Sequence, residues 1–259
     1  MSKKIISFLT AVIFTTLLAA CGVQGNFGES KPISHQSFDA LLKQYVTLEG
    51  WVDYRGLMAD RSKLDHYLEL LSSHHPNEKN WSRNERLAYW INAYNAFTLQ
   101  LILDHYPVES IKDIKKGIPF VNTVWDIKFI KIEGKEYDLN NIEHGIIRSE
   151  FNEPRIHFAV NCASYSCPVL QNFAYTAGQL DEQLDHAAKE FLNDPRRNKI
   201  QEQSLQLSKI LSWYSGDFKQ DGKDVMDYVR QYSNMDIAED PKVDYLDYDW
   251  RLNDKRMYD

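Results

Sequence analysis

Apolar residues recur every three to four positions along several parts of the chain, and this spacing predicts amphipathic helices. The first helix is expected from Ser37, and the second runs from about Asp60 to Ser73. Their apolar faces consist of Phe38, Leu41, Leu42 and Tyr45 in the first, and of Leu64, Tyr67, Leu68 and Leu71 in the second. Further helices are predicted over residues 140–150, 177–192 and 222–232.

The clearest helix prediction covers Ser82 to His105, and Pro107 follows it. Ser82 is an N-cap residue, and Glu85 three positions later completes the pattern of a capping box. The apolar positions of this segment are Leu87, Trp90, Ile91, Tyr94, Phe97, Leu101 and Ile102, which cover most of the helix circumference. A helix that is apolar on nearly all sides is expected at the centre of the fold.

Strand-like alternation replaces the helical spacing over residues 126–132. Glu133, Gly134 and Lys135 then read as a hairpin turn, which leads into a second strand. Further strands are predicted at residues 155–160, in a hairpin over 199–203 and 205–208, and at an edge over 243–250. We therefore expect an α+β fold, in which residues 36–259 form a single domain with helices around a small, mainly antiparallel sheet.

Charge and composition narrow the classes of partner. The formal net charge is −7, without a basic cluster, so nucleic acid is not expected as a partner. Aromatic residues make up 13% of the chain, which indicates a folded body rather than a disordered one. The same aromatic side chains suit a core or a peptide- or glycan-binding cleft equally, so composition does not separate an enzyme from a binding module.

Two polar residues interrupt the apolar helix. Asn92 and Asn95 lie about one turn apart, and buried amides need hydrogen-bond partners. Either both amides brace the backbone of a crossing loop, or they line a polar site. His144 and Arg148, four residues apart, form a second polar group. Their spacing is equally typical of an interacting pair on the surface and of a functional site.

The segment from His157 to Pro168 carries the most specific chemistry, because it contains Cys162 and Cys167. An imidazole near a thiol can generate a nucleophilic thiolate. His157 and Cys162 meet only if the chain bends near Asn161. The alternative is a disulfide, since a loop of this length can curl back on itself.

A metal site is a third interpretation of the same residues. Zinc bound by His144, His157, Cys162 and Cys167 would lack the close ligand spacing of structural zinc sites. We therefore predict neither a metal nor another cofactor.

Three ordered segments, residues 88–96, 142–148 and 155–168, resemble the bacterial and plant family known as domain of unknown function 547. The resemblance extends roughly from Trp90 to Asp194. Members typically have Cys at the position of Cys162, whereas the second Cys is replaceable by Ser. Ala163 stands where Gly is usual, so a backbone angle peculiar to Gly is not expected there. The family brings no established activity.

These residues lead to two hypotheses of function. In the first, the protein is a thiol-dependent hydrolase or acyl transferase acting on peptide or amide substrates, with Cys162 as nucleophile and His144 or His157 as base. Asn92 and Asn95 would orient the imidazole or polarise a carbonyl. In the second, a non-catalytic envelope module binds peptide or glycan, and Cys162 and Cys167 form a disulfide.

The N-terminus predicts export. Lys3 and Lys4 precede the largely apolar run Ile5–Leu18, and Ala19-Ala20-Cys21 follows it. Residues 1–20 thus read as a signal peptide, since the run is shorter than the roughly 20 residues of a membrane span. The segment resembles a bacterial lipobox, which implies that Cys21 is lipidated and that the membrane is a partner through this lipid. Gly22 is similar to the outer-membrane pattern of double-membrane bacteria, and residues 21–35 are expected to be the lipidated N-terminus and tether.

The Cys21→Ser variant tests the lipid anchor. Without the thiol that accepts the diacylglycerol, the variant should incorporate no labelled fatty acid, and the precursor should be stalled or released. Metabolic labelling followed by membrane fractionation measures both effects. Labelling equal to that of the wild type would exclude Cys21 as the anchor.

Overall fold

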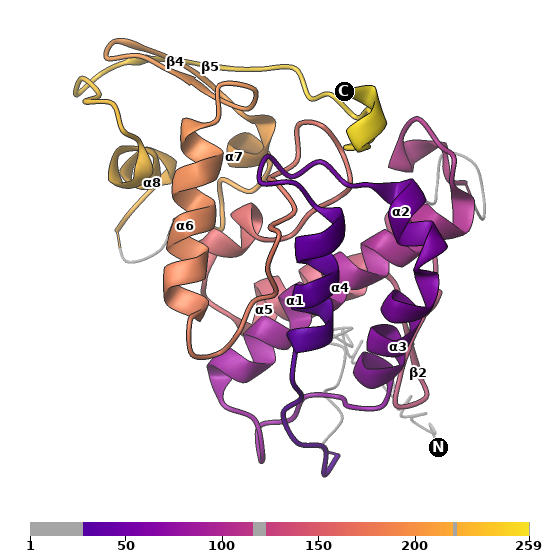
Figure 1. The fold of residues 1–259 in the computed structure, drawn as a ribbon. Coiled ribbons are helices and arrows are strands. Elements are labelled where there is room, and N and C mark those ends of the chain that lie inside the picture. Colours follow the sequence, from indigo (N-terminus) through magenta and orange to yellow (C-terminus); the bar gives the residue numbers. More distant parts are fainter. Residues whose placement is uncertain (1–27, 116–122, 220–221, 259) are drawn as a thin grey trace, which may run out of the picture.

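The computed structural model describes residues 28–115, 123–219 and 222–258 (Figure 1). The predicted signal peptide at residues 1–20 and the lipidation site Cys21 lie outside these described residues. Within the described ranges, no helix is long and apolar enough to cross a membrane.

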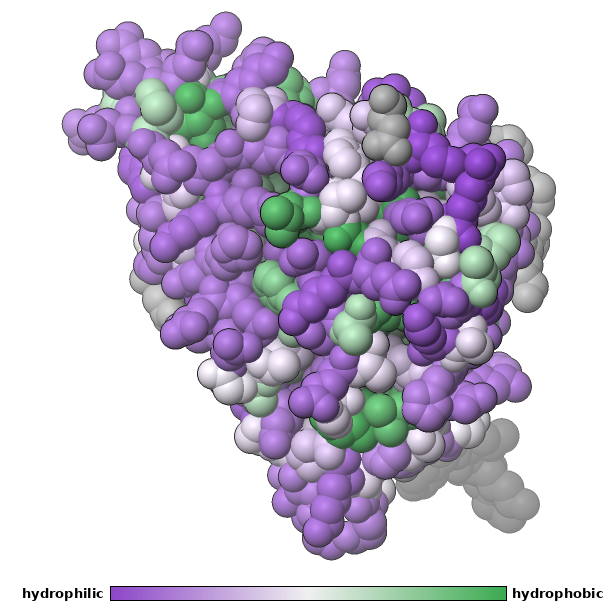
Figure 2. Space-filling model, viewed as in Figure 1, coloured by the Kyte–Doolittle hydropathy of each residue, from purple (hydrophilic) through white to green (hydrophobic). Residues whose placement is uncertain are grey.

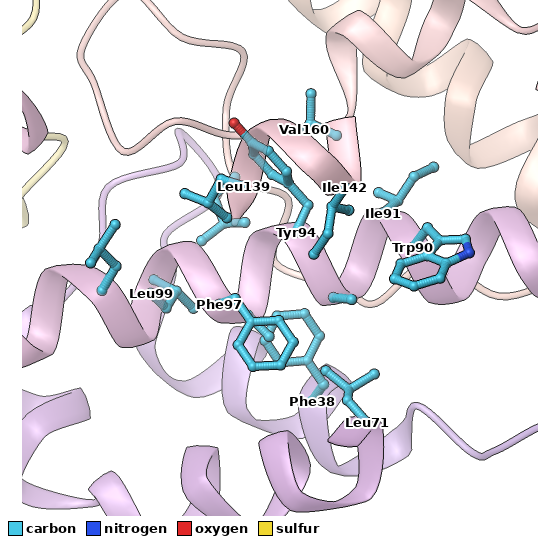
Figure 3. Packing of buried hydrophobic residues seen from close by; sticks show 14 of the residues in the cluster. Phe38, Leu71, Trp90, Ile91, Tyr94, Phe97, Leu99, Leu139, Ile142 and Val160 are labelled. Atoms are coloured by element: carbon cyan, nitrogen blue, oxygen red, sulfur yellow. The ribbon is translucent and has the colours of Figure 1, made fainter. Parts of the chain in front are cut away.

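A long central helix organises the described structure. The α-helices are α1 (Gln36–Tyr45), α2 (Tyr54–Ala59), α3 (Arg61–Ser72), α4 (Arg83–His105), α5 (Arg148–Glu150), α6 (Leu180–Asn193), α7 (Lys209–Trp213) and α8 (Val225–Tyr232). α4 lies between Phe38 and Leu71 on one side and Ile142 on the other (Figure 3). The expectation that this helix is central and buried is confirmed.

The start of α4 follows from its sequence. The Ser82 hydroxyl accepts a hydrogen bond from the backbone N–H of Glu85, and the Glu85 carboxylate accepts one from the backbone N–H of Ser82. This reciprocal pair satisfies two of the backbone donors that a helix start leaves unpaired. The predicted capping box is therefore confirmed.

The strands form two small sheets. In the first, β1 (Ile130–Ile132) pairs antiparallel with β2 (Lys135–Tyr137), and both turn residues have positive φ, +46° at Glu133 and +79° at Gly134. Positive φ at both central residues is the geometry of a two-residue hairpin turn, as predicted.

The second sheet has the order β3 (Lys199–Ile200), β4 (Ser204–Leu207) and β5 (Lys242–Tyr245). Its β3 and β4 form the predicted antiparallel hairpin, whereas β5 runs parallel to β4. The α+β class is confirmed, with two separate sheets in place of one and a parallel pair at the edge.

Irregular helical turns contribute part of the candidate site. They are the 3₁₀ turns η1 (Ile111–Asp113), η2 (Val124–Asp126), η4 (Pro154–Phe158) and η5 (Lys255–Met257), and the π-helical turn η3 (Asn141–Ile147) that leads into α5. The strand predicted at residues 155–160 is wrong, because η4 occupies most of it. Pro154 favours a helical start, and the Glu153 carboxylate accepts from the backbone N–H of Arg155.

Two groups of buried apolar residues lie on either side of η4. The larger surrounds α4, and the smaller lies between α6, α7, α8 and β4. Phe158 belongs to the smaller group, where its ring lies 5.1 Å from that of Phe191 and 5.8 Å from that of Phe218. His157 and Phe158 are thus held at the border of the two groups.

The face of the molecule in Figure 2 is mostly hydrophilic, with small separate apolar patches.

Stability at acidic pH should depend on His35. Burial lowers its pKa from 6.5 to about 4, and its Nδ1 lies 2.7 Å from the Tyr67 hydroxyl. The imidazole of His35 is therefore protonated below pH 6.5 in the unfolded chain and only below about 4 in the folded chain. The stability that the neutral ring contributes is fully present above pH 6.5 and is lost as the pH falls to about 4. We expect His35→Gln to reduce the loss of stability over this window by up to about 3 kcal/mol.

Urea unfolding at pH 7, 5.5 and 4 measures this effect. His66→Gln, at an exposed position on α3, controls for the removal of one imidazole. Equal pH dependence in the wild type and in His35→Gln would contradict the prediction.

Candidate functional site

Cys162 lies beside two hydroxyl groups. Its Sγ is 3.1 Å from Ser164 Oγ and 3.3 Å from the Tyr248 hydroxyl, and the Ser164 hydroxyl donates to that of Tyr248 over 3.0 Å. Hydroxyl donors stabilise a thiolate more than a thiol. Cys162 as a residue is half-buried.

The loop around Cys162 is held by its own polar groups and by the C-terminal segment. The Asn161 side chain donates to the carbonyl of Pro168 and accepts from the backbone N–H of Ala163. The backbone of residues 249–253 forms hydrogen bonds with that of residues 163–166. One of them runs from the N–H of Asn253 to the carbonyl of Ala163 over 3.0 Å. This pairing brings Tyr248 to the sulfur.

The two cysteines are both free thiols in different environments. The backbone N–H of Cys162 donates to Cys167 Sγ over 2.9 Å. Burial tends to raise the pKa of Cys162, but its hydrogen bonds with Cys167, Ser164 and Tyr248 lower it below its ordinary value. Burial raises the pKa of Cys167 well above that value. Cys162 is therefore the thiol that ionises first.

His157 is buried on η4 and stacks on Tyr214 with 3.9 Å between ring centroids. Its Nε2 lies 2.7 Å from Asp217 Oδ2. The Arg148 guanidinium binds both oxygens of the same carboxylate, with Nε 2.5 Å from Oδ2 and Nη2 2.8 Å from Oδ1. Asp217 thus joins His157 to Arg148.

The proton on His157 follows from these partners. Burial would raise the pKa of Asp217, yet the hydrogen bonds from His157 and Arg148 hold it well below its usual range. Burial lowers the pKa of His157, although Asp217 opposes this, so the ring is neutral at pH 7. An ionised carboxylate at Nε2 keeps the proton on that nitrogen. The lone pair is then on Nδ1, which has no hydrogen-bond partner among the described residues.

Cys162 and His157 line one cavity of about 70 Å³. Its other walls are formed by Tyr94, Trp125, Glu143, Val160, Cys167, Ile210, Trp213, Tyr214, Tyr248 and Trp250. In the described part of the chain, no hydrogen bond joins the thiol to the imidazole. Trp213 is 50% exposed, so this wall continues to the surface.

Comparison with known families is informative for the middle of the chain. Residues 78–192 match the family described as "Protein of unknown function, DUF547". This segment carries a DUF547 domain. The comparison with curated proteins gave no match, and neither did the comparison with solved structures. The predicted resemblance is thereby confirmed, and the matched segment contains all three motifs.

His144, Asn92 and Asn95 do not line this cavity. His144 is 41% exposed, and its Nδ1 accepts from Arg148 Nη1 over 2.9 Å. Asn92 accepts from the backbone N–H of Tyr175 and donates to its carbonyl. Asn95 pairs in the same way with the N–H of Asn161 and the carbonyl of Ala159. Both amides therefore brace loop backbone, which was one of the two interpretations of the sequence.

Several residues of the site were missed. Asp217 and Tyr248 lie C-terminal to the matched segment and have no motif of their own. Ser164 lies within the third motif and could have been named from its spacing to Cys162. Within the described ranges, no group of three or more His, Cys, Asp or Glu side chains is arranged to hold a metal ion.

The backbone at Ala163 corrects a prediction. Its φ is +59°, in the left-handed region that favours Gly, so the expectation of an ordinary angle was wrong. The loop keeps the conformation although Ala has replaced the usual Gly, because Asn161 and Asn253 hold both backbone groups of this residue.

Ala163→Gly should therefore be about 1 kcal/mol more stable than Ala159→Gly, since both changes remove a buried methyl group and raise unfolded-state entropy, but only Ala163→Gly removes left-handed strain. Ala159→Gly is the matched control: Ala159 is equally buried, with φ −108°. The control should be destabilised. Chemical denaturation of both variants measures the difference, and equal destabilisation by the two changes would refute the strain argument.

Proposed function

We propose that the protein is a thiol-dependent hydrolase or acyl transferase acting on peptide or amide substrates, with Cys162 as nucleophile and His157 as base. The observation that carries this proposal is the shared cavity, in which the half-buried thiol lies with a buried neutral imidazole whose Nδ1 is unpaired among the described residues. Asp217, clamped by Arg148, is the positioning residue that keeps this imidazole in one tautomer and orientation.

The chemistry begins with the thiol proton. Nδ1 of His157 accepts it as the Cys162 sulfur attacks the carbonyl carbon, and the protonated ring then gives it to the leaving amine. Water or an acceptor group attacks the resulting thioester with the same imidazole as base. The contact between thiol and imidazole forms with substrate, since catalytic hydrogen bonds are often long without it.

The size of the cavity limits what enters it. About 70 Å³ admits the reacting carbonyl group and a few neighbouring atoms. The rest of the substrate then lies outside, over the exposed ring of Trp213. His144 does not line this cavity, so of the two predicted bases His157 is the better supported.

The proposed location is the cell envelope. Lipid on Cys21 would anchor the chain to a membrane, and the tether would hold the folded part on the exported side, facing the periplasm if the host has an outer membrane. An envelope peptide or amide is the substrate class that this location would supply.

Acylation by a small activated ester tests the nucleophile and base. Mass spectrometry of protein incubated with p-nitrophenyl acetate should locate the acyl group on Cys162, and Cys162→Ser should not be labelled there. His157→Gln and Asp217→Asn should slow turnover of the ester by about 100-fold or more, because general-base catalysis is lost.

His144→Gln is the matched control, as the other histidine considered as base, and it should stay within about threefold of the wild type. Thermal unfolding at pH 7 checks that each variant is folded. Acylation at another residue, or equal rates in folded His157→Gln and wild type, would refute the assignment.

A further inference from the structure

Cys162 and Cys167 are arranged as a pair. The hydrogen bond of 2.9 Å from the backbone N–H of Cys162 to Cys167 Sγ, with covalent bond lengths, keeps their Cα atoms no more than about 7 Å apart. Disulfides join Cα atoms about 4.4–6.8 Å apart. The loop is already turned between them, because the N–H of Cys167 donates to the carbonyl of Ser164 over 3.1 Å. A bridge thus needs only side-chain rotation and a small shift.

The two thiols differ in the way that sequential oxidation requires. Cys162 opens to a cavity, and the hydroxyls of Ser164 and Tyr248 lie beside its sulfur. Cys167 is 3% exposed, and burial keeps it protonated by raising its pKa. An oxidant therefore meets the thiolate of Cys162 first. The cavity of about 70 Å³ has room for a molecule of a few heavy atoms.

We propose that Cys162 is an oxidation site for small hydroperoxides and that Cys167 is the thiol that resolves it. The Cys162 thiolate attacks the terminal peroxide oxygen, so a sulfur–oxygen bond forms as the oxygen–oxygen bond breaks. Sulfur gives two electrons to the peroxide, and the leaving alkoxide or hydroxide takes up a proton. The Tyr248 hydroxyl, which accepts from Ser164 and lies 3.3 Å from the sulfur, is placed to donate to this leaving oxygen.

The second step consumes Cys167. Its sulfur attacks the Cys162 sulfenic acid, the sulfur–oxygen bond breaks, and hydroxide leaves as water with the Cys167 proton. The disulfide then occupies the proposed nucleophile, and a dithiol reductant restores both thiols by exchange. This inference does not rest on the proposed acyl transfer, because it is measured on the thiols themselves.

The test uses the reduced full chain and hydrogen peroxide. After one equivalent of peroxide, quenching with iodoacetamide and peptide mapping should show a Cys162–Cys167 disulfide that dithiothreitol reverses. In Cys167→Ser, and in Cys167→Ala as a second variant in case the first is misfolded, dimedone should trap a sulfenic acid on Cys162. Cys162→Ser should leave Cys167 reduced, with peroxide consumption at least tenfold slower.

Two results would overturn the proposal. One is Cys162 that stays reduced in the wild type under these conditions. The other is a sulfenic acid on Cys162 that persists in the wild type without bridging to Cys167. The ester assay without peroxide distinguishes a failure of this proposal from a failure of the proposed function. If the disulfide forms but the ester does not acylate Cys162, only the acyl-transfer proposal fails.

Discussion

Buried amides on the central helix constrain the loop that carries the cysteines. A carboxamide removed from water must replace its hydrogen bonds, and in the described structure Asn92 and Asn95 bond to backbone groups. Asn95 binds backbone just before Cys162, and Asn92 binds it at Tyr175. Both ends of the loop are thus tied to α4. The sulfur takes its position from a helix whose own place is set by the apolar groups around it.

Asp217 imposes the second constraint. A partly buried carboxylate is costly without partners, and here Arg148 and His157 supply three hydrogen bonds. The carboxylate in return keeps the His157 proton on Nε2 and leaves a lone pair on Nδ1. This one side chain joins the loop at residue 217 to two segments about sixty residues earlier in the sequence. The same interaction that makes burial of the carboxylate tolerable also prepares the imidazole to act as a base.

The thiol depends on a different part of the chain from the imidazole. The C-terminal segment pairs with the cysteine loop and delivers Tyr248, whose hydroxyl lowers the pKa of Cys162. Cys167, which is buried, contributes a further hydrogen bond to Cys162. These contacts favour a thiolate, and a thiolate beside a second thiol is both a nucleophile and a group open to oxidation. One arrangement of side chains therefore supports both of the proposed chemistries.

Local interactions explain what the sequence determined by itself. The capping box of α4, the Glu133-Gly134 turn and the apolar spacing of α1 and α3 involve partners a few residues apart, so spacing alone predicts them. The third motif marked Cys162 and His157, but a short apolar run fits a strand or a helical turn, and η4 was therefore misread. Tertiary structure alone decided that β5 joins β4 in parallel, that Asp217 meets His157 and that Tyr248 meets Cys162. These partners lie tens of residues apart in the sequence. Which carboxylate contacts His157 and which hydroxyl contacts Cys162 depends on how whole elements pack, and no local sequence pattern predicts that packing.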